Sequence, residues 1–250
     1  HDPPAPFRPD LHRRCRSAAD PMSPDGQSIL KHLGTVAAER EKRRQSSALD
    51  ARVVEVKRYQ HARFEHTYSD LLASSRYAKP ARFFLEDLYG PRDFTARDDQ
   101  FARIVPGLVR LFPAGIVSTV RQLAELHALS EAMDTLMATH FETVPLTDAA
   151  YGEIWRASGR PADRERQVVL MSAVGSALDR YTRNPLLRNS LRLMRGPARA
   201  AGLMALHQFL ENGFDTFGAM GGASGFLGTI EMRERALARK LFDGGSFEPG

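Results

Sequence analysis

The most restrictive feature of the sequence is the stretch from residue 27 to residue 75, which contains no proline and only one glycine, Gly34. The stretch is rich in Ala, Glu, Lys, Arg and Leu, the residues with high helix propensity. Apolar side chains such as Val53 and Val56 recur in it near helical spacing. The stretch therefore predicts a long N-terminal helix, with a break favoured near Ser46 and Ser47, where the neighbouring residues are polar on every side.

Prolines divide the rest of the chain into further helical segments, since proline is tolerated at the first turn of a helix. They stand at the expected starts, namely Pro80, Pro113, Pro145, Pro161, Pro185 and Pro197. Thr147 and Asn184 are expected N-caps, and Pro106 is expected to kink or end its helix. Strand signals are weak. We therefore expect an all-α fold with about eight helices in an orthogonal or bundle-like array.

The hydrophobic content of 42% in 250 residues is sufficient for one sizeable core. We expect a single all-helical domain over residues 23–245 and a flexible C-terminus over residues 246–250. Residues 1–22 are rich in Pro and Arg and precede a natural helix start. We interpret them as a disordered tail, an expression-vector remnant or the product of an over-extended gene prediction.

The single cysteine, Cys15, excludes an internal disulfide framework and indicates a reducing compartment, which we take to be the bacterial cytoplasm. The net charge of +5 is a modest excess, so nucleic acid is not an expected partner. No run of 18 apolar residues occurs, and we therefore expect no membrane partner.

One dense motif, FFLEDLYGPRDFTARDDQFARIVP, spans residues 83–106. Phe83 and Phe84 are expected to anchor a short helix in the core, because aromatic side chains bury large areas. Tyr89 begins a turn, around which four charges alternate in sign, namely Arg92, Asp93, Arg97 and Asp98. Two interpretations remain open for this motif corner: a salt-bridged, capped connection between helices, or a site for a ligand or partner.

This run, together with the final stretch FGAMGGASGFLGTIEMRERALARKLFDG, resembles an uncharacterised family of all-helical bacterial proteins with an FFLxxLYGPRD-type motif. The resemblance covers the chain from about Leu33 to Phe242. It implies a helical fold and a bacterial source. It implies no activity and no catalytic residue, because the family is a domain of unknown function.

The sequence lacks the common catalytic signatures. It contains no phosphate-binding loop, no dinucleotide fingerprint, no H-E-x-x-H and no C-x-x-C. Two histidines on apolar helix faces have glutamate four residues later, namely His127 with Glu131 and His207 with Glu211. Residues at this spacing share a helix face, so each pair is a candidate metal ligand set for iron or manganese, and either histidine a candidate haem ligand.

Three functions follow as hypotheses. The first is a non-enzymatic interaction or regulatory module, without a cofactor, that binds a protein partner or forms a homodimer. The second is a metal- or haem-binding oxidoreductase or sensor that uses the two His/Glu pairs. The third is a nucleic-acid-associated regulator. The missing motifs favour the first.

Overall fold

The computed structural model describes residues 22–88, 93–142 and 145–247, and within these ranges the chain forms helices and no strand. The helices are α1 (Pro24–Arg44), α2 (Ser47–Thr67), α3 (Ser69–Ala73), α4 (Ala78–Phe83), α5 (Thr95–Leu111), α6 (Ala114–Ala138), α7 (Asp148–Ser158), α8 (Pro161–Thr182), α9 (Pro185–Leu193), α10 (Arg195–Ala200), α11 (Met204–Met220) and α12 (Ser224–Phe242). A π-helical turn, η1 (Phe84–Leu88), continues α4.

The expected all-α class is confirmed, but the expected number of about eight helices is too low. Three of the helices, α3, α4 and α10, are only five or six residues long, and of these only α3 contains no expected proline start. Such short helices leave little periodicity in a sequence, because one turn shows no repeat. The long N-terminal helix is also divided where the serines favoured a break, since the Ser46 hydroxyl caps α2 by accepting from the Leu49 amide.

The expected N-caps and a proline helix start are observed, whereas the proline expected to interrupt a helix does not end it. Thr147 and Asn184 cap α7 and α9 as expected, and Pro185 occupies the first position of α9. Pro106 neither ends nor delimits its helix, because α5 continues through it to Leu111. Pro106 lies on the exposed side of α5, where water can satisfy the carbonyl group that loses its backbone partner.

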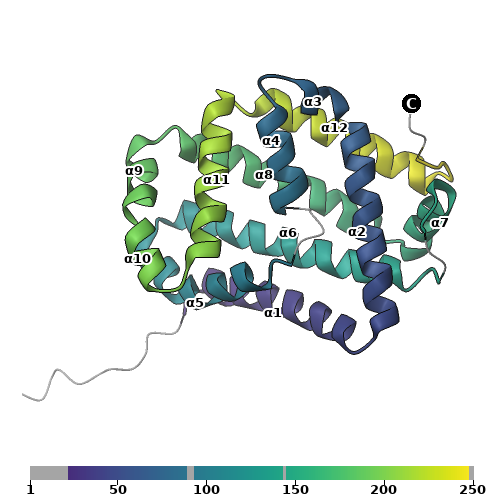
Figure 1. The fold of residues 1–250 in the computed structure, drawn as a ribbon, viewed down its shortest axis with the longest axis horizontal. Helices are drawn as coiled ribbons and strands as arrows, with labels where there is room; N and C mark the ends of the chain where they lie inside the picture. Colours follow the sequence, from purple (N-terminus) through teal and green to yellow (C-terminus); the bar gives the residue numbers. More distant parts are fainter. Residues whose placement is uncertain (1–21, 89–92, 143–144, 248–250) are drawn as a thin grey trace, which may run out of the picture.

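The helices form two crossing sets (Figure 1). α1, α6, α8 and α12 run along the long axis of the molecule, and α2, α4 and α11 cross them steeply. α6, the longest helix, packs against α1, α2, α7 and α8. α8 in turn packs against α11 and α12. The result is the orthogonal array that the sequence suggested, with α6 and α8 at its centre.

Three apolar clusters hold the array together, and each joins segments that are distant in the sequence. The largest contains Phe83 and Phe84 of the motif together with Phe217 and Phe226 from α11 and α12. A second surrounds Tyr151 and Trp155 of α7. Among the described helices, none has both the length and the apolar character required to cross a membrane. The apolar residues of these clusters serve packing between helices.

The crossing of α8 and α12 depends on Gly175. A methyl group placed there would lie 2.5 Å from Leu227 Cδ2, and Leu227 is itself buried. We expect Gly175→Ala to lower the free energy of unfolding by about 1–2 kcal/mol, since overpacking outweighs the gain in helix propensity. Gly228→Ala on α12 is the control, because nothing lies within 4 Å of that position. It should raise stability by up to about 1 kcal/mol. Chemical denaturation measures the change in the free energy of unfolding for each variant, and the two changes should have opposite signs. Changes of the same sign would contradict this packing.

Candidate functional site

A cavity of about 130 Å³ lies where α2, α6, α7, α8, α12 and η1 meet. One buried water molecule needs roughly 10–15 Å³ by a comparable measure, so the cavity has room for several waters or one small molecule. Its polar lining includes Lys57, Arg63, His127, Glu131, Asp134, Tyr151, Arg164 and Glu234. Its apolar lining includes Phe64, Phe84, Leu85, Trp155, Met171 and Ile230. The site is thus polar and apolar at once, as ligand pockets commonly are.

The cavity wall contains one unusual cation, Arg164, in the first turns of α8. Its side chain is buried and stacks on Trp155, with Cζ 3.9 Å from the ring centroid. It donates to Gln167 Oε1 at 3.1 Å and lies 2.9 Å from Met137 Sδ. Within the described chain this guanidinium forms no ion pair with a carboxylate, and burial lowers its pKa. A buried charge without a paired counter-ion lowers the stability of the folded state. A contribution to stability therefore does not explain the presence of Arg164.

Four buried groups of the cavity lining have no hydrogen-bond partner, namely Nε of Arg63, the hydroxyl of Tyr151, Nε1 of Trp155 and Nε of Arg164. Each carries a hydrogen that it can donate, and three of them can only donate. Such groups are normally satisfied, because leaving a buried donor unpaired costs about 1–3 kcal/mol. Their common position around one cavity indicates a site that is complementary to hydrogen-bond acceptors.

Carboxylates and a lysine form another part of the wall. Lys57 Nζ lies 2.7 Å from Glu131 Oε1 and 4.0 Å from Asp134 Oδ2. Burial alone would raise the pKa of Glu131, but Lys57 and Arg43 outweigh it and hold that pKa at about 2. Burial raises the pKa of Asp134, and the nearby cations Lys57, Arg164 and Arg43 offset this rise only in part. Glu131 is therefore firmly ionised, whereas Asp134 takes up a proton more readily.

The motif corner is connected to this cavity through Asp98. Its carboxylate accepts from Arg40 Nη2 at 2.7 Å and from Arg97 Nε at 3.1 Å, and His127 Nε2 lies 2.8 Å away. Burial opposes ionisation, yet these partners, His127 first, hold the pKa of Asp98 well below its ordinary value. Since His127 lines the cavity, Asp98 fixes the orientation of an imidazole in its wall.

The other motif residues have structural partners where they are described. Phe83 and Phe84 are buried in the largest apolar cluster. Asp93 accepts from both the amide and the hydroxyl of Thr95, at 2.9 and 2.6 Å, and so closes the start of α5. Tyr89 and Arg92 lie outside the described residues.

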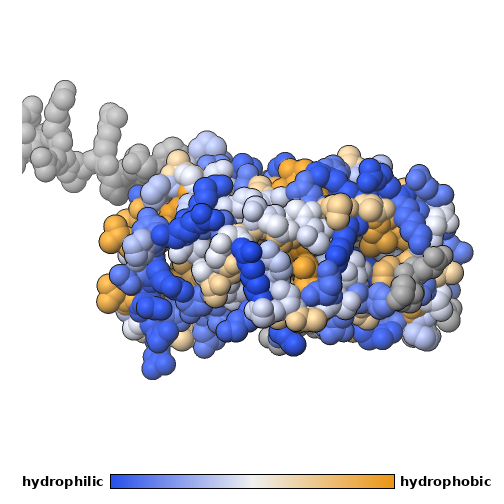
Figure 2. All heavy atoms as spheres, turned by 90° about the horizontal axis from the view of Figure 1, so that it is seen from above, coloured by the Kyte–Doolittle hydropathy of each residue, from blue (hydrophilic) through white to orange (hydrophobic). Residues whose placement is uncertain are grey.

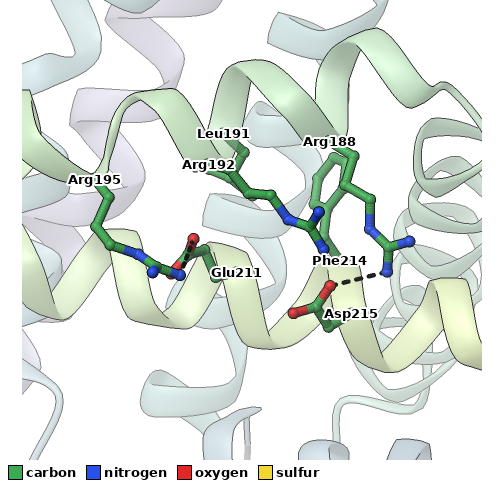
Figure 3. A pocket seen from close by; sticks show the side chains of 7 residues that line it. All are labelled: Arg188, Leu191, Arg192, Arg195, Glu211, Phe214 and Asp215. Carbon is green, nitrogen blue, oxygen red and sulfur yellow. Dashed lines mark hydrogen bonds and ion pairs between the residues drawn. The ribbon is translucent and has the colours of Figure 1, made fainter.

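The two His/Glu pairs occupy different places. His127 and Glu131 both line the cavity, but each bonds to residues of other helices. His207 and Glu211 lie on α11 beneath α9, where the His207 ring contacts the Leu191 carbonyl at 2.9 Å. Glu211 accepts from Arg195 (Figure 3). Within the described residues, no three His, Cys, Asp or Glu side chains form a group suited to a metal ion.

Several cavity residues were not singled out from the sequence, above all Lys57, Asp134, Tyr151, Trp155 and Arg164. One signal was present, because Trp155 is the only tryptophan of the chain and follows Tyr151 by one helical turn. The spacing places the two rings on one face of α7. Nothing in the sequence, however, places Arg164 against that face.

The ionised state of Glu131 predicts a specific acid sensitivity. Its pKa falls from an ordinary 4.5 to about 2 on folding, so its stabilising effect is complete above pH 4.5 and is lost as the pH falls through 2. We expect Glu131→Gln to cost about 3–5 kcal/mol at pH 7, because Arg43 and Lys57 lose their buried counter-ion. Denaturation at several pH values measures the cost, which should shrink between pH 4.5 and 2. Glu41→Gln, in an exposed ion pair with Arg44, should change nothing. A constant cost across this pH range would contradict the assignment.

Comparisons with known proteins place the chain in a family. No curated protein and no solved structure matches it. The family model described as "Domain of unknown function (DUF8198)" matches residues 39–247, which is most of the chain and agrees with the resemblance to an uncharacterised family. The chain therefore belongs to the DUF8198 family, whose function is unknown.

Proposed function

We propose that this protein is a helical binding module whose interior cavity holds a small organic anion. The observation that supports this most is Arg164, a buried guanidinium without a carboxylate partner, stacked on Trp155. A carboxylate ligand would supply the missing counter-ion, and an arginine fork suits two carboxylate oxygens.

The unpaired donors support the same ligand chemistry. Arg63, Tyr151 and Trp155 line the cavity, and each has a buried donor without a partner, as Arg164 has. Anions accept several such bonds at once, and bonds to a charged acceptor are about twice as strong as neutral ones. A cationic ligand would accept no hydrogen bonds from these donors, so this part of the cavity wall would contribute little to its affinity.

The apolar lining supports an organic anion rather than an inorganic one. Phe64, Phe84 and Met171 line the cavity, and the Trp155 ring adds a flat surface. Inorganic phosphate would leave these surfaces without a contact, whereas a short alkyl or aromatic body would bury apolar area against them. We therefore propose a carboxylate on a small apolar body.

Binding of this kind needs no chemical step, which agrees with the preference for a non-enzymatic module. We propose no metal or haem here, because both oxygens of Glu131 already accept from cations and His127 is engaged by Asp98. A regulatory role through a protein partner or a homodimer, in the bacterial cytoplasm, remains part of this proposal. The single cysteine supports the reducing compartment.

Ligand binding can be followed by the intrinsic fluorescence of the protein, since Trp155 is the only tryptophan. We expect benzoate, phenylacetate or hexanoate to change its emission in a saturable way and to raise the melting temperature. A ligand at about 100 times its dissociation constant adds about 2.7 kcal/mol to stability. Benzamide, which is neutral, and inorganic phosphate, which is not apolar, should do neither. The proposal fails if none of the carboxylates acts, or if benzamide acts equally well.

The role of Arg164 can be separated from a structural one with two matched variants. Arg164→Met removes an unpaired buried charge, so we expect the ligand-free protein to be as stable as the wild type or more stable, and to lose its response to carboxylates. Arg43→Met is the control, because Arg43 is equally buried, at 6% against 7%, but pairs with Glu131. That change should cost about 3–5 kcal/mol. Thermal and denaturant unfolding compare the two, and a large loss of stability in Arg164→Met would assign it a structural role.

A further inference from the structure

One end of the molecule is strongly cationic. Residues 180–210 contain six arginines and neither aspartate nor glutamate. They cover the last turn of α8, the helices α9 and α10, and the start of α11, which together form the left end of the molecule in Figure 1. Within the described chain, three of these arginines, Arg180, Arg192 and Arg199, form no ion pair with a carboxylate. The charge of these three arginines is thus available for an external anion.

The same end exposes large apolar side chains. α9 contains no buried residue. Leu186 and Leu193 are 73% and 79% exposed, and Met194 is 54% exposed. A helix with so large an apolar surface in solvent is unusual, because exposed side chains of this size are normally scattered singly. In Figure 2, apolar residues project among hydrophilic ones at this end of the molecule.

A second segment adds to this end. The turn between α5 and α6 exposes Leu111, at 81%, and Phe112. The Thr119 hydroxyl in α6 lies 3.1 Å from the Tyr181 hydroxyl, which ties the start of α6 to the end of α8 just before α9. Two segments separated by about seventy residues in the chain therefore expose apolar side chains at one end. We call Leu111, Phe112, Leu186, Leu193 and Met194, with the arginines of residues 180–199, the end face.

One arginine of α9 and one of α10 form ion pairs with carboxylates of α11 (Figure 3). Arg188 donates to Asp215 at 2.9 Å and Arg195 donates to Glu211 at 2.8 Å. Arg192 lies between these two ion pairs, near Phe214, and has no carboxylate of its own. These residues line a hollow of about 340 Å³. The ion pairs join α9 and α10 to α11, and Arg192 is left to interact with an anion from outside.

We propose that the end face docks on the surface of an anionic lipid bilayer. Protruding leucine and methionine side chains next to arginines are the composition of helices that lie in the membrane interface. Four to eight basic residues on such a helix suit anionic lipid head groups. Long arginine side chains can reach the head-group phosphates while the apolar side chains enter the boundary of the acyl region. This contact needs no membrane-spanning helix. It departs from the sequence-based expectation of no membrane partner, which rested only on the lack of a long apolar run.

Charge alone would also attract nucleic acid, and apolar surface alone would also attract a protein. The end face combines both, and its apolar side chains point outward rather than forming an aromatic platform for bases. A bilayer satisfies the two features together, since it presents negative charge above an apolar layer. The lipid surface is therefore the occupant that these residues fit best.

Flotation with vesicles tests this proposal. We expect the protein to bind vesicles of equal parts phosphatidylcholine and phosphatidylglycerol, and to bind pure phosphatidylcholine at least tenfold more weakly. The triple change Leu186→Gln, Leu193→Gln, Met194→Gln should weaken binding to the anionic vesicles at least tenfold. Because all three side chains are exposed, circular dichroism and melting should remain unchanged. Met232→Gln is the matched control, since Met232 is 63% exposed on α12, and it should bind as the wild type.

Arg192→Gln tests the electrostatic part of the proposal. This change should weaken binding to anionic vesicles and make that binding less dependent on salt concentration. Equal binding to both vesicle types would overturn the proposal, and so would full binding of the triple variant to anionic vesicles. A third contrary result would be that a short DNA duplex displaces the vesicles equally well from the wild type and from the triple variant. The last result would show a purely electrostatic face. If the protein did not float with either type of vesicle but formed a stable complex with an acidic protein through the end face, the end face would be assigned to a protein partner instead.

Discussion

The carboxylate of Glu131 is the interaction on which the arrangement of the first half of the chain depends. Its two oxygens accept from Arg43 of α1 and Lys57 of α2, at 2.5 and 2.7 Å, while Glu131 itself lies in the middle of α6. Arg43 is further fixed by the Glu131 carbonyl and by the Thr135 hydroxyl. A buried charge is tolerable only with partners of this quality. The crossing of α1, α2 and α6 is therefore specified by charge as well as by apolar packing.

The cavity next to this network has the opposite character. Arg43 and Arg164 are both buried arginines, yet the first is surrounded by acceptors and the second has an amide, a thioether and an aromatic ring. Of the six buried side-chain polar atoms that lack a hydrogen-bond partner in the described residues, four belong to residues that line the cavity. Proteins accept local instability where a ligand is bound and compensate for it elsewhere. This contrast between two similar side chains is what distinguishes a binding site from a structural network here.

The sequence predicted the features that depend on neighbouring residues. Helical class, the break at Ser46, the caps at Thr147 and Asn184, and the burial of Phe83 and Phe84 all follow from local patterns. The cavity could not be predicted, because its pairs are distant in the sequence: Lys57 and Glu131 are separated by 74 residues. The i, i+4 spacing of His127 and Glu131 shows a shared helix face but not the residues opposite it. Those proved to be Asp98 for the histidine and two cations for the glutamate.

One helix, α5, contributes to the surroundings of both proposed sites. Asp98 lies in its first turn and holds His127 in the cavity wall, while its last residue, Leu111, belongs to the end face. A helix of 17 residues is about 25 Å long, so α5 reaches from the cavity wall to the end face. If a ligand shifted His127 and α5 followed as one body, the exposed leucine at the far end of the helix would move as well. By linkage, the coupling is reciprocal, so a surface that favours one position of α5 would change the affinity of the cavity by the same factor.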